Sequence, residues 1–108
     1  MGFQTGGAIV DFVVLAILKN KDEYGYVLTS EVRNILDISE TAMYPALKRL
    51  QKSGFLDTYD SPLNGRNRRY YHLTAKGREI LTLFQKEWGT FKCKMDTLLT
   101  EENDENNR

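Results

Sequence analysis

The stretch ETAMYPALKRLQKS, residues 40–53, constrains the fold of this 108-residue chain more than any other. Met43, Leu47 and Leu50 recur at helical spacing, which predicts one buried face. Polar and basic side chains occupy the opposite face, and Gly54 follows where a helix C-terminus is expected. A helix of this kind has to pack on a small core and leave its basic side outward.

A second amphipathic helix is predicted just before it, over residues 27–36. Its buried face is expected to carry Leu28, Val32, Ile35 and Leu36. The three residues DIS then form a short turn. Two helices joined in this way, the second with a basic outer face, are typical of a helix-turn-helix.

Pro45 is unexpected inside a helix, because proline removes one backbone hydrogen bond and clashes with the preceding turn, at a cost of about 3 kcal/mol. If the N-cap is Thr41 rather than Ser39, Pro45 is the fourth helical residue and the damage stays within the first turn. Two interpretations remain open. Either the proline only stiffens the helix start, or an irregular start turns the Tyr44 ring toward a DNA groove.

A β-hairpin is predicted next, from strand-like residues 55–59 and 69–73 with a turn at Pro62 and Asn64-Gly65. Arginines lie at and just after its tip. Arg68 and Arg69 are adjacent, so in a strand they point to opposite faces. We therefore expect only one of these two to reach DNA with its side chain.

Positive charge is concentrated in the middle of the chain, although the net charge is zero. Residues 39–74 hold six basic and three acidic side chains, whereas residues 1–38 hold three basic and five acidic ones. Basic residues on two separate elements favour phosphate contacts over a merely solvated face. The expected DNA-contact residues are Thr41, Tyr44, Pro45, Lys48, Arg49, Lys52, Arg66, Arg68 and Arg69.

A long final helix is predicted from a Thr74 cap to about Thr100, followed by an acidic, disordered tail over 101–108. Apolar residues in this helix recur in steps of three and four, as in a short coiled-coil seam. This seam predicts a dimer interface. Its members are Leu81, Phe84, Trp88, Phe91, Met95 and Leu98.

The apolar stretch 8–18 predicts a helix that is buried on more than one side and can also touch a second subunit. Asp11 interrupts it, and it is shorter than the roughly 20 apolar residues that span a bilayer. No basic segment precedes it, as a signal peptide would require. With Cys93 as the lone cysteine, these features predict a cytoplasmic protein without membrane contact.

The sequence contains no residue pattern that is typical of a catalytic site or a metal site. One histidine and one cysteine cannot form a metal-ligand cluster or a Cys/His pair with a third orienting group. No glycine-rich phosphate loop is present. We therefore expect no enzyme, no metal and no cofactor.

Together these elements predict a mainly α fold with a small β-hairpin: a winged helix-turn-helix followed by a long C-terminal dimerisation helix. We expect residues 1–74 to form the DNA-binding domain, including an N-terminal helix that supports the dimer. Residues 75–100 would form the dimerisation helix.

The sequence resembles the PadR family of transcriptional regulators, in particular its short subfamily. The matching stretches are YGYVL at 24–28, TAMYPALKRLQKSGFL at 41–56 and GRNRRYYHLT at 65–74, together with Gly77. The resemblance covers roughly residues 8–99. It implies a homodimer in which the third helix enters the major groove, the wing contacts the backbone or minor groove, and the last helix joins the subunits.

The resemblance also implies a repressor of a pseudo-palindromic operator, relieved by a planar aromatic effector. Some members bind flat aromatic compounds between paired tryptophans, at a position similar to Trp88. Phe12, Val13 and Phe91 would then be walls of that site, whereas otherwise Trp88 is a core residue of the dimer. The alternative function is a winged-helix protein-interaction module without sequence-specific DNA binding.

Overall fold

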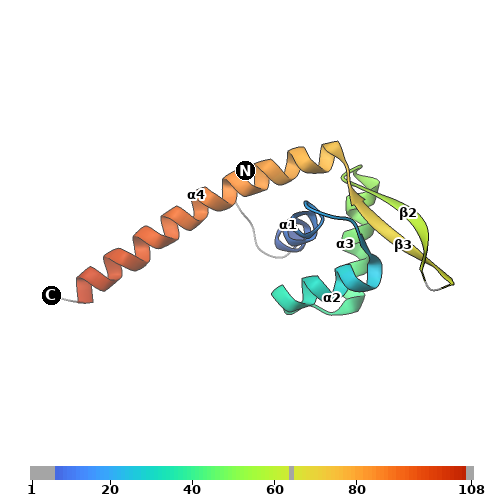
Figure 1. The fold of residues 1–108 in the computed structure, drawn as a ribbon. Coiled ribbons are helices and arrows are strands. Elements are labelled where there is room, and N and C mark those ends of the chain that lie inside the picture. Colours follow the sequence, from blue (N-terminus) through green and yellow to red (C-terminus); the bar gives the residue numbers. More distant parts are fainter. Residues whose placement is uncertain (1–6, 64, 107–108) are drawn as a thin grey trace.

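The computed structural model describes residues 7–63 and 65–106 of the chain. Its elements are α1 (Gly7–Ile17), β1 (Glu23–Tyr24), α2 (Gly25–Ile35), α3 (Glu40–Lys52), β2 (Leu56–Leu63), β3 (Arg66–Leu73) and α4 (Ala75–Asn106). Figure 1 shows α1, α2 and α3 grouped together, with the β2–β3 wing on one side and α4 extending to the other. The predicted fold class is confirmed.

The wing is an antiparallel sheet of three strands in the order β1-β3-β2. β2 and β3 form the predicted hairpin, with Leu56 opposite Leu73 at its base. Gly65 in its turn has φ 77°, a left-handed conformation that favours glycine. The two-residue strand β1 was not predicted, because two residues give no alternating pattern.

The hydrophobic core lies where α1, α2 and α3 meet the base of the wing and the first part of α4. Its buried members are Val14, Leu15, Leu18, Leu28, Val32, Met43, Leu47, Leu50, Leu56, Leu73 and Leu81. The predicted buried face of α3 is therefore confirmed.

The predicted buried face of α2 is wrong at one residue, since Ile35 is 63% exposed. The physical reason is the end of the helix. α2 stops at Ile35, and the next residue, Leu36, is extended with φ −119° and ψ 142°. This change of direction brings Leu36 against the core and leaves Ile35 outward.

The N-cap of α3 is Ser39, whose Oγ accepts a hydrogen bond of 3.2 Å from the Ala42 amide. Pro45 is therefore the sixth helical residue, so the interpretation that placed it fourth, after a Thr41 cap, is wrong. The helix continues through Pro45, and Tyr44 lies within it rather than at an irregular start. Thr41 and Pro45 are both exposed, so water can reach the Thr41 carbonyl that lacks its helical donor.

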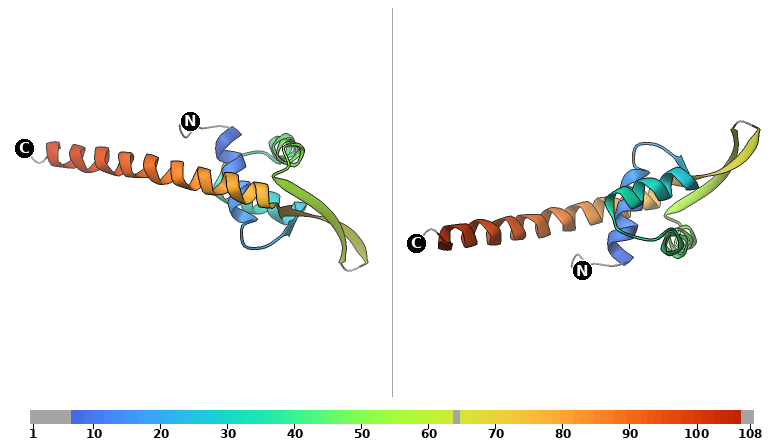
Figure 2. Two further views of the ribbon diagram at one scale, coloured as in Figure 1. Left: turned by 90° about the horizontal axis from the view of Figure 1, so that it is seen from above. Right: turned by 90° about the horizontal axis from the view of Figure 1, so that it is seen from below.

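Thr74 caps α4, as predicted: its Oγ1 accepts a hydrogen bond of 2.9 Å from the Gly77 amide. The same hydroxyl donates a hydrogen bond of 2.7 Å to the Gly54 carbonyl, which ties the end of α3 to the start of α4. The helix continues to Asn106 instead of ending near Thr100, so much of the predicted tail 101–108 is helical. Both views in Figure 2 show α4 extending far beyond the core, along the 66 Å axis of the molecule.

Candidate nucleic-acid interface

The outward face of α3 lies opposite its buried side chains. Met43, Ala46, Leu47 and Leu50 pack inward. The exposed face carries Thr41, Tyr44, Pro45, Lys48 and Lys52. The Tyr44 side chain is 64% exposed, and within the part of the chain that the structure describes, Lys48 and Lys52 form no ion pair. This surface can offer two full positive charges and a phenol to a polyanion.

Arg49 lies at the edge of that face and is bound elsewhere. Its Nη2 donates a hydrogen bond of 2.5 Å to Oδ1 of Asp11 on α1. Burial raises the pKa of the Asp11 carboxyl, and the hydrogen bond and charge of Arg49 oppose this effect only in part. The pair therefore holds α3 against α1, and Arg49 offers less unpaired positive charge at this surface than Lys48 does.

Arg68 and Arg69 of the wing lie on opposite faces of β3, as expected for adjacent residues of a strand. The guanidinium of Arg68 lies 4.8 Å from the ring centroid of Tyr24. Arg69 Nε lies 3.8 Å from Oδ1 of Asp60, which is directly opposite it on β2. Arg69 is on the same face of β3 as buried Leu73, whereas Arg68 is on the other face, so the predicted opposite directions are confirmed.

Arg66 begins β3 beside the wing tip and is exposed. Within residues 7–63 and 65–106 it forms no ion pair. Of the three wing arginines, it therefore has the side chain that is most available to a DNA backbone or minor groove.

A cavity of about 160 Å³ lies between the start of α2, the first half of α3 and β3. It is lined by Gly25, Tyr26, Thr29, Glu40, Tyr44, Leu47 and Tyr71. Burial raises the pKa of the Tyr71 phenol, and Tyr44 adds to this while Arg69 opposes it. The cavity therefore brings the predicted contact residue Tyr44 beside residues that no sequence pattern groups with it.

The outer face of the wing carries a row of tyrosine rings that sequence reasoning missed. Tyr59 and Tyr70 are stacked, with centroids 5.4 Å apart. Tyr24 lies 5.9 Å from Tyr70 and 6.4 Å from Tyr26. The alternate residues Tyr70 and His72 indicate one face of β3, but Tyr24 joins this face only through strand β1, and Tyr26 follows Tyr24 at the start of α2. These contacts join β1 and the start of α2 to the hairpin.

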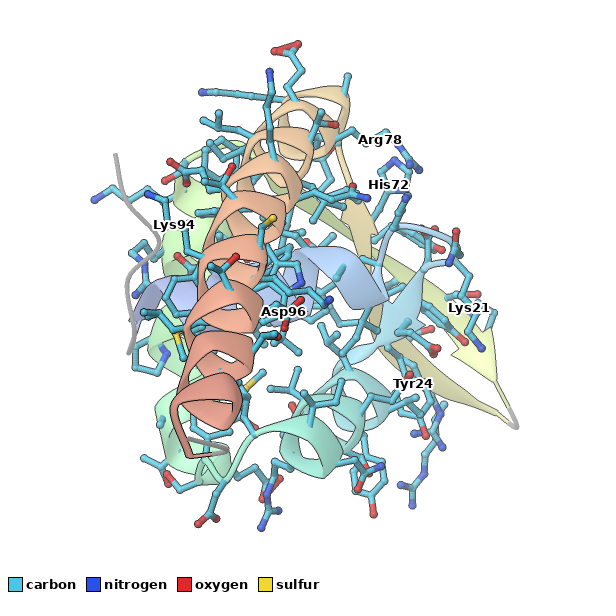
Figure 3. The ribbon with its side chains drawn as sticks, turned by 90° about the vertical axis from the view of Figure 1, so that its left-hand side faces the viewer. Lys21, Tyr24, His72, Arg78, Lys94 and Asp96 are labelled. Carbon is cyan, nitrogen blue, oxygen red and sulfur yellow. The ribbon has the colours of Figure 1, made fainter. Side chains whose placement is uncertain are left out.

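Asp22, which directly precedes β1, forms hydrogen bonds with two side chains of the wing. Its two carboxylate oxygens lie 2.6 Å from the donating Tyr59 hydroxyl and 2.9 Å from His72 Nδ1. Burial acts to raise the pKa of Asp22, but the bonds from Tyr59 and His72 and the charges of His72 and Arg78 lower it overall. The bond to Asp22 raises the pKa of Tyr59 to about 12. Figure 3 shows His72 and Arg78 close together beside the start of α4.

The predicted seam of α4 divides into two parts. Leu81 is 5% exposed and belongs to the core of its own domain, and Phe84 packs against Phe12 at 5.7 Å between ring centroids. The later members are exposed on one side of the helix. They are Trp88, Phe91, Met95 and Leu98, and Leu99 adjoins them.

The four residues suggested as an effector site come from two helices. Phe12 and Val13 are half-buried on α1 and pack against the core. Trp88 and Phe91 lie on α4 with ring centroids 6.1 Å apart. α1 and α4 are in contact, and Phe12 packs on Phe84 of α4.

Membrane spans and metal sites are both absent from the part of the chain that the structure describes. None of its helices combines the length and the apolar character needed to cross a membrane. The described residues also contain no group of three or more His, Cys, Asp or Glu side chains arranged to hold a metal ion.

Comparison with known proteins adds independent information. Residues 14–83 match the Transcriptional regulator PadR-like family. A Streptococcus mutans UA159 protein of known crystal structure is 36% identical, with a TM-score of 0.84 over 93% of this chain and 94% of that one. A PadR family transcription regulator from hypervirulent Clostridium difficile R20291 is 34% identical, with a TM-score of 0.76 over 83% of this chain and 97% of that one. A transcriptional regulator of Mycobacterium tuberculosis is 34% identical over 76 residues, which are 69% of this chain and 71% of that protein.

Proposed function

This chain belongs to the PadR-like family of transcriptional regulators, and we propose that it is a repressor that binds a pseudo-palindromic operator as a homodimer. The outward face of α3 carries this proposal. Lys48 and Lys52 project from a helix whose opposite side is held in the core, and the part of the chain described here offers them no acidic partner. A rigid basic helix of this kind fits the major groove of DNA.

In the proposed complex α3 lies in the major groove and the wing follows the adjacent backbone. Tyr44 and Lys48 face the groove, whereas Arg66 contacts phosphate or enters the minor groove. Arg69, on the inner face of the wing with Tyr71, supports the α3 contacts. Arg68 contributes mainly by holding Tyr24, because its guanidinium lies over that ring.

The dimer is proposed to form through the part of α4 that lies beyond the core. Met95 and Leu98 are exposed there on the same side as Trp88 and Phe91. A second copy would cover this apolar side and bring two α3 helices to half-sites about one helical turn apart. Residues 1–74 and 75–100 would then be the DNA-binding and dimerisation parts of each subunit.

An effector site between the two copies of Trp88 is also proposed, as a means of relieving repression. The ring faces of Trp88 and Phe91 suit a planar aromatic compound. Such a ligand derepresses only if it binds more tightly to a dimer whose α3 spacing no longer fits the operator.

DNA binding is tested by fluorescence anisotropy with a duplex from directly upstream of the protein's own gene and with a scrambled duplex. We expect tight, selective binding that weakens between roughly 50 and 200 mM salt, and that Lys48→Ala and Arg66→Ala both weaken. Equal and weak binding to both duplexes would instead favour the alternative, a protein-interaction module.

Dimer formation is tested by sedimentation of two matched variants of α4. Met95→Glu places a charge on the apolar side, whereas Cys93→Glu places the same charge two residues away on the opposite side. We expect Met95→Glu to yield monomers and Cys93→Glu to remain dimeric. Wild-type protein that sediments as a monomer at micromolar concentration would refute the dimer.

A further inference from the structure

Glu40 is the one acidic residue of α3, and it stands at the start of a helix whose other charges are Lys48, Arg49 and Lys52. Its side chain is exposed and, among the residues that the structure describes, forms no ion pair or side-chain hydrogen bond. The cap of α3 is supplied by Ser39, so Glu40 is not needed for that role. A carboxylate in this position repels the phosphates of DNA, so we looked to the neighbouring residues for another role of Glu40.

Glu40 lies beside aromatic side chains. It lines the 160 Å³ cavity together with the rings of Tyr26, Tyr44 and Tyr71. Thr29, only 8% exposed, lines the same cavity, and no other described residue occupies its hydroxyl by a hydrogen bond. Tyr26 and Tyr44 are 73% and 64% exposed, so water would leave the carboxylate only when a base covers it, and the hydrogen bond that the carboxylate accepts would then strengthen.

The position along α3 decides what can reach this carboxylate in a complex with DNA. The N-terminal residues of a recognition helix are those that contact base edges. An ionised glutamate accepts hydrogen bonds and donates none. In the major groove the exocyclic amino groups of cytosine (N4) and adenine (N6) are donors, whereas thymine O4 and guanine O6 are acceptors.

We propose that Glu40 is a specificity-determining residue that accepts a hydrogen bond from an exocyclic base amino group, of cytosine or adenine, in each operator half-site. The inference rests on the proposed DNA-binding function and adds to it the class of base that is read. Tyr26 and Tyr44 line the same cavity and would border this contact. A base that presents a carbonyl oxygen at this point would place one hydrogen-bond acceptor against another, the Glu40 carboxylate, and would bind less well.

The test is a scan of transition substitutions through a duplex selected by the wild-type protein from a random pool. A transition exchanges amino for carbonyl at the major-groove edge, so each substitution inverts donor and acceptor at one base pair. We expect one position per half-site at which the transition weakens wild-type binding about tenfold. The identity of the base at that position separates cytosine from adenine.

Glu40→Gln is the decisive variant, because an amide can donate as well as accept. We expect it to bind the transition-substituted duplex within about threefold of the original one. Glu40→Ala should lose the preference as well, while its binding to unrelated DNA strengthens through loss of a negative charge. Glu79→Gln, the same chemical change at an exposed residue of α4, should keep the wild-type profile.

A Glu40→Gln profile identical to that of wild type, in a protein that still binds its duplex selectively, would overturn this inference alone. Failure of the wild-type protein to select any duplex would overturn the proposed function and this inference with it. Thermal unfolding without DNA separates base reading from helix stability, since an acidic residue in the first turn also favours the helix dipole. Equal loss of affinity for every duplex, in parallel with lost stability, would also overturn base reading.

Discussion

Gly77 provides a test of how α4 is joined to the wing. A Cβ atom at this buried residue would lie well under 3.0 Å from the carbonyl oxygen of Phe55 and 2.5 Å from Cδ1 of Leu73. The Phe55 carbonyl accepts a hydrogen bond of 3.1 Å from the Thr74 amide, so the obstructing backbone is itself fixed. Gly77→Ala therefore forces the start of α4 away from the sheet.

The magnitude follows from two opposing effects. Alanine in a helix interior is favoured over glycine by about 0.5–1 kcal/mol. Overpacking a core costs about 1–3 kcal/mol, and here the obstacle includes backbone, so the upper end applies. The net loss is about 2 kcal/mol, which lowers Tm by roughly 10 °C in a domain of this size.

Gly89 provides a matched control in the same helix. A Cβ atom there has no heavy atom within 4 Å, so Gly89→Ala should stabilise by about 0.5–1 kcal/mol. Thermal unfolding of both variants, followed by circular dichroism at one protein concentration, shows whether each substitution lowers or raises the stability. Equal stabilisation by both substitutions would refute the close packing inferred at Gly77.

Three further predictions concern side-chain contacts. Arg49→Ala should raise the pKa of half-buried Asp11 further, as measured by NMR titration, and destabilise the protein by about 1 kcal/mol. Tyr59→Phe should bring the lowered pKa of Asp22 closer to its ordinary value and reduce the stability that is linked to it. Because the pKa of Asp22 is lower in the folded state, the stability that Asp22 contributes is present above its ordinary pKa. This stability is lost as the pH falls through the pKa of the folded state. Acid unfolding of wild type and of Tyr59→Phe measures this loss. Thr74→Ala removes the cap of α4 and should lower the free energy of unfolding by about 1–2 kcal/mol, as measured in urea.

Much of the fold could be predicted because it depends on local periodicity. The spacing of Met43, Leu47 and Leu50 was sufficient to identify the buried side of α3. The turn at Gly65 and the cap at Thr74 were likewise recognisable from residue type alone. In each case the physical cause lies within a few residues of the feature.

The remaining features depend on residues far apart in the sequence. β1 exists because Tyr24 pairs with Tyr70, and the partner of Arg49 is Asp11 on another helix. Leu81 has the spacing of a seam residue, yet it packs into the core of its own domain. No local pattern distinguishes these outcomes, since they are decided by how the elements pack.

The same limit applies to the candidate site. The sequence identified the basic side of α3, but the cavity beside Glu40 is formed by α2, α3 and β3 together. Tyr26 and Thr29 lie on α2, the helix before the recognition helix, and carry no charge, so composition gave no reason to include them.

The role of α3 in DNA binding is tested most directly by the salt dependence of operator binding for single lysine variants. If α3 lies on DNA, Lys48→Ala and Lys52→Ala should each reduce the slope of log K against log salt by about 1. Lys86→Ala, which removes the same charge from an exposed residue of α4, should leave the slope unchanged. Slopes unaffected by the α3 substitutions, or reduced equally by Lys86→Ala, would contradict the assignment of α3 as the DNA-binding element.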